Sequence, residues 1–286
     1  MPVAVVAMLA LIGAAVWLAA ARDDSAATDP SAGGDPGIAH VHGLGVDPAD
    51  GTLYAATHFG LFKIPDGESA TRVADRYQDT MGFTVVGPNH FLGSGHPDLR
   101  EAKPALLGLI ESTDAGNTWV DLSLSGQADF HALEAKHDTV YGFDSTSGRF
   151  MVSDNKTDWD TRTVLPMGDF TVSPDNPELV LATTEHGLVS STDGGRAFAT
   201  IDEAPPLLLV SWPTTDALYG VTTSAAVLAS ADGGATWEQR GSLDGSPEAL
   251  TAIDAQTVHA ATDQGIYTST DGGRSFTLRY SHPQAN

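Results

Sequence analysis

Three short segments each place two side chains that can bind a metal ion two residues apart. They are His40-Val-His42, Asp79-Thr-Met81 and Asp129-Phe-His131. Residues two apart in a β-strand project from the same side of the strand. Imidazole, thioether and carboxylate together suit a transition metal: copper where methionine joins histidine, with zinc as the alternative. The chain has no cysteine, which excludes thiolate ligands and disulfides.

Such segments, far apart in the sequence, can meet only if the fold brings their strands together, and an internal repeat predicts that it does. Four boxes have the form Ser-x-Asp-x-Gly-x-x-aromatic, and a fifth, degenerate copy keeps the aspartate and the tryptophan. Their aspartates are Asp114, Asp154, Asp193, Asp232 and Asp271, at steps of 40, 39, 39 and 39 residues. A constant step of this length indicates a repeat architecture.

Four short β-type segments accompany each copy of the repeat, which is typical of a β-propeller blade. We therefore predict an all-β, six-bladed propeller with blades at 40–77, 78–126, 127–165, 166–203, 204–244 and 245–286. Each box is expected to be a tight hairpin whose aspartate accepts bonds from turn N–H groups and whose glycine supplies a positive φ. The five box aspartates are accordingly interpreted as structural, and the ring has no evident strand exchange to close it.

In a propeller with these hairpins on one face, the starts of the first strands and the ends of the second strands converge on the other face. The first-strand starts of blades 1–3 then form two tiers, with His40, Asp79 and Asp129 above and His42, Met81 and His131 below. His58 and His96, at second-strand ends, belong to the same face. One hypothesis is a metal site drawn from His40, His42, Met81, His96 and His131. The alternative is a hydrated channel lined by hydrogen-bonded histidines.

The same face also carries acidic residues that could serve a different chemistry. Asp79, Asp129 and Glu185 are candidates for the two carboxylates that glycoside hydrolysis requires. Between His96 and Gly108 the chain is several residues longer than in the other repeats. Long loops of this kind often bind ligands, although surface decoration is the other explanation.

The boxes resemble the Asp-box (BNR) repeats of sialidases and their relatives. Residues 40–62 look like the first blade of bacterial exported proteins of the sialidase-like "glycosyl hydrolase" group. The resemblance implies a six-bladed propeller and raises the question of sialidase activity. A sialidase clamps its substrate carboxylate with arginines, and no expected first strand offers one. We therefore expect a protein that binds a small ligand, glycan or metal ion, with a glycoside hydrolase as the second hypothesis and a protein-docking propeller as the third.

Composition and the N-terminal segment suggest where the protein acts. The formal net charge of −23 argues against a nucleic-acid partner, because phosphate contacts require basic patches. Residues 2–21 carry no charge and end in Ala19-Ala20-Ala21, which suits a signal peptide or a membrane anchor. Residues 22–39 read as a flexible linker. We expect an exported monomer that is extracellular or held at the cell surface, with membrane contact only through the N-terminal segment.

Overall fold

The computed structural model describes residues 35–65 and 69–282. The chain divides into two units, Met1–Pro36 and Gly37–Asn286. The second unit contains all the strands described below, whereas the expected signal or anchor segment and most of the linker lie outside the described residues. In the ranges that are described, no helix is both long and apolar enough to cross a membrane.

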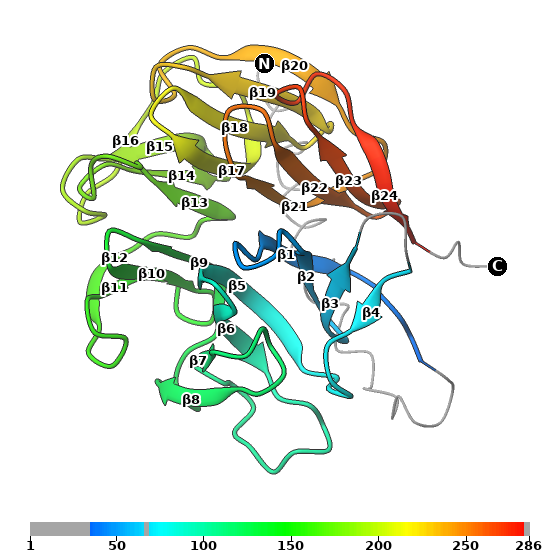
Figure 1. Cartoon of the computed structure of the whole chain (residues 1–286). Coiled ribbons are helices and arrows are strands. Elements are labelled where there is room, and N and C mark those ends of the chain that lie inside the picture. The colour runs from blue at the N-terminus through cyan, green and yellow to red at the C-terminus, as the bar shows by residue number, and fades with distance from the viewer. Residues whose placement is uncertain (1–34, 66–68, 283–286) are drawn as a thin grey trace, which may run out of the picture. The chain divides into compact units, whose positions relative to one another are not determined.

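Six four-stranded antiparallel sheets form the second unit, each built from four consecutive strands (Figure 1). The first strands of neighbouring sheets lie beside one another all the way round, from the first sheet to the sixth and back to the first. This arrangement is a six-bladed β-propeller, and it confirms the predicted fold class. Blades 1 to 3 comprise β1 (Val41–Val46), β2 (Leu53–Thr57), β3 (Gly60–Ile64) and β4 (Thr71–Arg72); β5 (Asp79–Gly87), β6 (His90–His96), β7 (Leu109–Ser112) and β8 (Val120–Ser123); and β9 (Phe130–Lys136), β10 (Thr139–Asp144), β11 (Arg149–Ser153) and β12 (Asp160–Val164).

The remaining blades repeat the same order of strands. Blades 4 to 6 comprise β13 (Asp169–Val172), β14 (Val180–Thr184), β15 (Gly187–Ser191) and β16 (Ala199–Thr200); β17 (Leu207–Thr214), β18 (Ala217–Thr222), β19 (Ala226–Ser230) and β20 (Glu238–Ser242); and β21 (Pro247–Ala252), β22 (Val258–Thr262), β23 (Gly265–Ser269) and β24 (Thr277–Ser281).

The core lies between the blades. The second strands β2, β18 and β22 are buried at every position, because a neighbouring blade covers each face of their sheets. The outer strands β8, β20 and β24 are mostly exposed or half-buried. One apolar cluster, for example, joins Phe150 of blade 3 to Phe170 and Val180 of blade 4. Packing of this kind fixes the position of each first strand relative to its neighbours.

A side chain of one blade accepts a hydrogen bond from a backbone N–H of the next blade at all six interfaces. Around the ring the pairs are Asp47 with Asn89, Ser94 with Phe130, Glu134 with Val172, Asp169 with Val210, Ser211 with Ala252, and Glu248 with Val41, at N···O distances of 2.9–3.0 Å. A buried N–H group needs such a partner, because leaving it unpaired costs about 1–3 kcal/mol. Four of the six acceptors are acidic, so part of the negative charge has a structural role.

The ring closes between blade 6 and blade 1, and the described residues exchange no strand there. Glu248 of β21 accepts the bond from Val41 N, and the Arg279 guanidinium of β24 donates to the carbonyl of Ile64. Apolar residues of both blades, including Val41 and Ile266, share one core cluster. Side-chain contacts such as these therefore hold blade 6 against blade 1 in the described part of the chain.

The box hairpins share one hydrogen-bond pattern. In the first, Ser112 Oγ donates to Asp114 Oδ1 at 2.9 Å, and Asp114 Oδ1 also accepts from Thr118 N at 2.8 Å. The backbone N–H of Gly116, whose φ is +83°, donates to Ser112 Oγ at 2.8 Å. The boxes of Asp193, Asp232 and Asp271 repeat this pattern.

The degenerate box differs from the prediction that Asp154 is its structural aspartate. Asn155, and not Asp154, accepts the bonds from Ser153 Oγ, Thr157 N and Asp158 N, at 3.3, 3.0 and 2.8 Å. Asp154 instead accepts a bond from Thr139 Oγ1 at 3.2 Å. The acceptor must stand two residues after the serine, as Asp114 does after Ser112, and that position holds Asn155.

Candidate metal centre

The first strands of five blades are bulged near their start. In blade 1, Val41 pairs with Thr57 and Gly43 pairs with Ala56, so His42 is an extra residue on its strand. The residues skipped in the same way in blades 2, 3, 5 and 6 are Met81, His131, Leu208 and Glu248. A β-bulge re-aims a side chain locally, and bulges are frequent beside functional sites.

A cavity of about 540 Å³ lies between the first strands of all six blades, and four of the bulge residues line it. These are His42, Met81, His131 and Glu248. A volume of this size is within the range of small-molecule pockets. The bulges therefore concentrate polar and sulfur-containing side chains at one end of the central cavity.

Three side chains from two blades meet beside this cavity, which His42 itself lines, and are here named the His42 cluster: His42, His58 and Asp79. His42 Nε2 lies 3.1 Å from His58 Nδ1, His58 Nδ1 lies 3.2 Å from Asp79 Oδ1, and His42 Nε2 lies 3.3 Å from Asp79 Oδ1. The His42 side chain is only 8% exposed, while those of His58 and Asp79 are 29% and 24% exposed. Their three atoms form a nearly equilateral triangle that could hold a metal ion.

The electrostatics of the cluster keep the histidine neutral and the carboxylate charged. Burial lowers the pKa of His42 to about 4, against the opposing effect of its hydrogen bond with Asp79. Burial also acts to raise the pKa of Asp79, but its hydrogen bonds and charge interactions with His42 and His58 outweigh burial and hold that pKa well below its usual range. A neutral imidazole and an ionised carboxylate are the forms that bind metals.

Protons and a cation are alternative ways to satisfy this triangle. A ring nitrogen either carries a hydrogen or offers a lone pair, and an ionised carboxylate oxygen only accepts. If both His42 Nε2 and His58 Nδ1 carry hydrogens, both can donate to Asp79 Oδ1, although their nitrogens then lie only 3.1 Å apart. If either lacks its hydrogen, a nitrogen lone pair faces Asp79 Oδ1 at 3.2 or 3.3 Å. One cation within reach of the three atoms would satisfy all of them together.

His40 stands beside this cluster but has a different charged partner. Its ring centroid lies 4.8 Å from that of His42 and 5.6 Å from that of His58. Its Nδ1 pairs with Glu248 Oε1 at 2.8 Å. The predicted tiers are therefore wrong as contact groups: Asp79 contacts histidines of the preceding blade, and His40 contacts the last blade. The bulges are the reason, because they break the simple alternation along the first strands.

A second group, here named the His96 cluster, comprises His96, Asp129 and His131. His131 Nε2 lies 2.8 Å and His96 Nε2 lies 3.5 Å from Asp129 Oδ2. Asp129 is 3% exposed. The structure thus brings His96 and His131 to one carboxylate, which was assigned to catalysis, but in the described residues only the His42 cluster has three ligand atoms close enough to share a metal ion.

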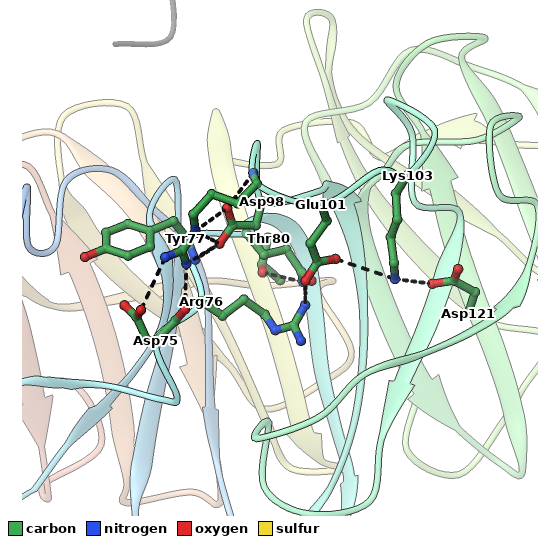
Figure 2. A network of polar contacts seen from close by, with 10 residues as sticks. Asp75, Arg76, Tyr77, Thr80, Asp98, Glu101, Lys103 and Asp121 are labelled. Carbon is green, nitrogen blue, oxygen red and sulfur yellow. Dashed lines mark hydrogen bonds and ion pairs between the residues drawn. The ribbon is translucent and has the colours of Figure 1, made fainter. Parts of the chain in front are cut away.

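The long loop after β6 positions His96. Its Ala105 carbonyl accepts a hydrogen bond from His96 Nδ1 at 2.9 Å. Figure 2 shows how the loop is fastened: Tyr77 N donates to Asp98 Oδ2 at 2.8 Å, and Arg76 pairs with Glu101. Lys103 then joins the loop to Asp121 of β8 at 2.8 Å (Figure 2). These contacts fix the loop and with it the Ala105 carbonyl, which orients the His96 ring.

The carboxylates proposed for hydrolysis do not gather as a set. Asp79 and Asp129 are each engaged by two histidines. Glu185 lies in the turn between β14 and β15, where its side chain is 81% exposed and pairs with the adjacent His186. Sequence reasoning missed the metal-binding roles open to His58 and Asp79, although the repeat had placed both on this face. It missed Glu248 altogether, and only its alignment with His42 in the repeat could have indicated it.

Comparisons with known proteins support the fold. A scan of protein-family models gives no match, and a search of curated proteins gives none either. Among solved structures, the GH74 enzyme of Niastella koreensis is similar, with 14% identity, a TM-score of 0.61, and coverage of 86% of this chain and 46% of that chain. This chain thus spans about half the length of that enzyme.

Two further similar structures are of proteins in complexes with a protein or a peptide. A chain of a nidogen/laminin complex has 11% identity and a TM-score of 0.62, over 81% of this chain and 93% of that one. The protein YCF48 bound to a D1 peptide has 15% identity and a TM-score of 0.53, over 85% and 83% of the two chains. At such low identities the likeness shows the fold alone.

Proposed function

We propose that this protein is an exported propeller that binds a divalent transition metal ion, zinc or copper, at the His42 cluster. The observation that carries the proposal is the triangle of three ligand atoms separated by 3.1, 3.2 and 3.3 Å. Zinc bonds to histidine and carboxylate are about 2.0–2.1 Å long, so the edge of a tetrahedral site is about 3.3–3.4 Å. The spacing of the three atoms is already close to that of a bound site.

The surroundings supply what a metal site needs in addition to ligands. Two imidazoles and a carboxylate leave further coordination positions for water or a small ligand. His40 lies next to the cluster, and its pairing with Glu248 resembles the carboxylate–histidine pairs that orient metal ligands. The formal charge of −23 favours cations over anions near the protein.

The test is metal titration of the full chain after treatment with a chelator, followed by calorimetry and by elemental analysis of the desalted protein. His42→Ala and Asp79→Asn should each weaken zinc or copper(II) binding at least about a hundredfold, because each removes one of three ligands. His186→Ala is the matched control, since His186 lies in the corresponding β2–β3-type turn of blade 4 with 83% exposure.

Unchanged affinity in the His42→Ala and Asp79→Asn variants would overturn the proposal. Turnover of a chromogenic glycoside by the metal-free protein, lost in Asp79→Asn or Asp129→Asn, would support the hydrolase hypothesis instead. If neither metal binding nor turnover is found, the docking propeller is the remaining hypothesis.

A further inference from the structure

The central cavity reaches the face of the propeller that carries the boxes. In a blade, the turn between the first two strands lies beside the box, as the bond from Gly272 N to the Gln256 carbonyl shows at 2.9 Å. Pro48 and Ile253 lie in such turns and line the cavity, as His42 does near the opposite ends of the first strands. The cavity therefore extends along the length of the first strands.

The end of the cavity at the boxes has an apolar rim, formed by Val46, Pro48, Val86, Pro213 and Ile253. These residues come from blades 1, 2, 5 and 6, which are adjacent in the ring. Val86 and Ile253 are 40% and 43% exposed, and they are two of the six large apolar side chains exposed in the described part of the chain. Apolar side chains left exposed around a concavity are typical of a ligand-binding site.

Lys136 lines the same cavity but has no hydrogen left for a ligand. Its Nζ donates to the carbonyls of Val172 and Trp212 at 2.7 and 2.9 Å, and it pairs with Glu134 Oε1 at 2.6 Å. An ammonium group has three hydrogens, and these three partners use all of them. An anionic ligand would have to displace one of these contacts.

The carboxylates that line the cavity, those of Glu134, Asp169 and Glu248, are satisfied as well. Both oxygens of Glu248 have the partners described above. Asp169 accepts a backbone N–H on each oxygen at 2.9 Å, and Glu134 divides its oxygens between Lys136 and a backbone N–H of blade 4. Burial raises the pKa of Asp169 to about 7, so this wall of the cavity disfavours a charge. A charged ligand would find no free counter-charge among these groups, and burying it unpaired is costly.

We propose that the central cavity binds an uncharged small molecule with a largely apolar body, which enters past the apolar rim. The volume of about 540 Å³ is within the range of sites for such molecules. None of the rim residues belongs to the His42 cluster, so this site does not depend on a metal ion.

The experiment is a fluorescence titration of the full chain with N-phenylnaphthylamine, an uncharged aromatic amine that brightens in apolar surroundings, with a chelator present. The protein should bind one probe per chain in a saturable manner. Val86→Asp and Ile253→Asp should each weaken binding at least about tenfold, because each places an unpaired carboxylate at the rim. Anilinonaphthalene sulfonate, which has the same rings and a negative charge, should bind at least about tenfold more weakly than N-phenylnaphthylamine.

Val164→Asp is the matched control, because Val164 is 66% exposed on the outer strand β12 and does not line the cavity. Its affinity for the probe should equal that of the wild type, and thermal unfolding checks that each variant is folded. Absence of saturable binding, as expected for a cavity that holds only water, would overturn the proposal. Equal affinity in the wild type, Val86→Asp and Ile253→Asp would place the probe elsewhere and also overturn it.

Equal binding of the two probes would contradict the argument that the cavity excludes charge, and with it the proposed class of ligand. Because the chelator keeps the His42 cluster free of metal, none of these results depends on whether zinc or copper binds there. The two proposals therefore fail separately.

Discussion

Replacement of Glu248 by alanine tests whether its side chain helps to close the ring. Glu248 Oε2 accepts from Val41 N at 3.0 Å, and Glu248 Oε1 pairs with His40 Nδ1 at 2.8 Å. The Glu248 side chain is 8% exposed and Val41 is fully buried, so water does not readily replace the lost acceptor at Val41 N.

The expected cost follows from these two contacts. An unpaired buried N–H group costs about 2 kcal/mol. The contact with His40 adds about 0.5 kcal/mol, because the His40 side chain is 46% exposed and water can take its place. The sum of about 2.5 kcal/mol corresponds to a fall in Tm of about 5 °C for a domain of this size.

The assay is equilibrium unfolding in urea with a chelator present, so that metal binding does not contribute. Glu238→Ala is the control, since Glu238 is 70% exposed and makes only a surface pair with Arg240, which predicts a change within about 0.5 kcal/mol. Hydrogen exchange at the Val41 amide should accelerate in Glu248→Ala. If Glu248→Ala is no less stable than Glu238→Ala, the closing contacts do not hold the ring in the way described.

Three further outcomes test the scaffold. Asn155→Ala should lower the free energy of unfolding by about 1 kcal/mol and Asp154→Ala by less than half of that, because Asn155 accepts the turn N–H bonds. If urea unfolding gives the reverse order, Asp154 and not Asn155 is the structural acceptor of this hairpin. Gly142→Ala should cost about 1–3 kcal/mol, since its Cβ would lie 2.6 Å from the buried Phe130 ring, whereas Gly87→Ala, which meets nothing within 4 Å, should be nearly neutral in the same assay. Hydrogen bonds from the Thr236 side chain and backbone hold the pKa of Asp232 at about 2, below its ordinary 3.8. The ionised form therefore stabilises the fold fully above about pH 4, and this contribution is lost as the pH falls toward 2. Asp232→Asn should flatten that part of the stability profile, and an unchanged profile would contradict the assigned bonds.

The sequence was sufficient for the fold because the boxes recur at nearly constant steps and each step has room for four strands. It also placed His42, His58, Asp79, His96 and Asp129 on one face. It could not show which of them touch, because β-bulges at His42, Met81 and His131 shift the pairing by one residue, and a single sequence carries no clear mark of a bulge. The box of Asn155 shows the same limit on a smaller scale, since one missing residue moved the acceptor to a neighbouring position.

The way the six sheets are assembled has a consequence for the order of the chain. Each sheet uses four consecutive strands, and within residues 35–65 and 69–282 blade 6 meets blade 1 through side chains such as Glu248 and Arg279. No blade is therefore required to come first. A circular permutant of the second unit, opened in the exposed connection between two other blades and joined across the present closing interface, would make the same sheets and the same two histidine clusters.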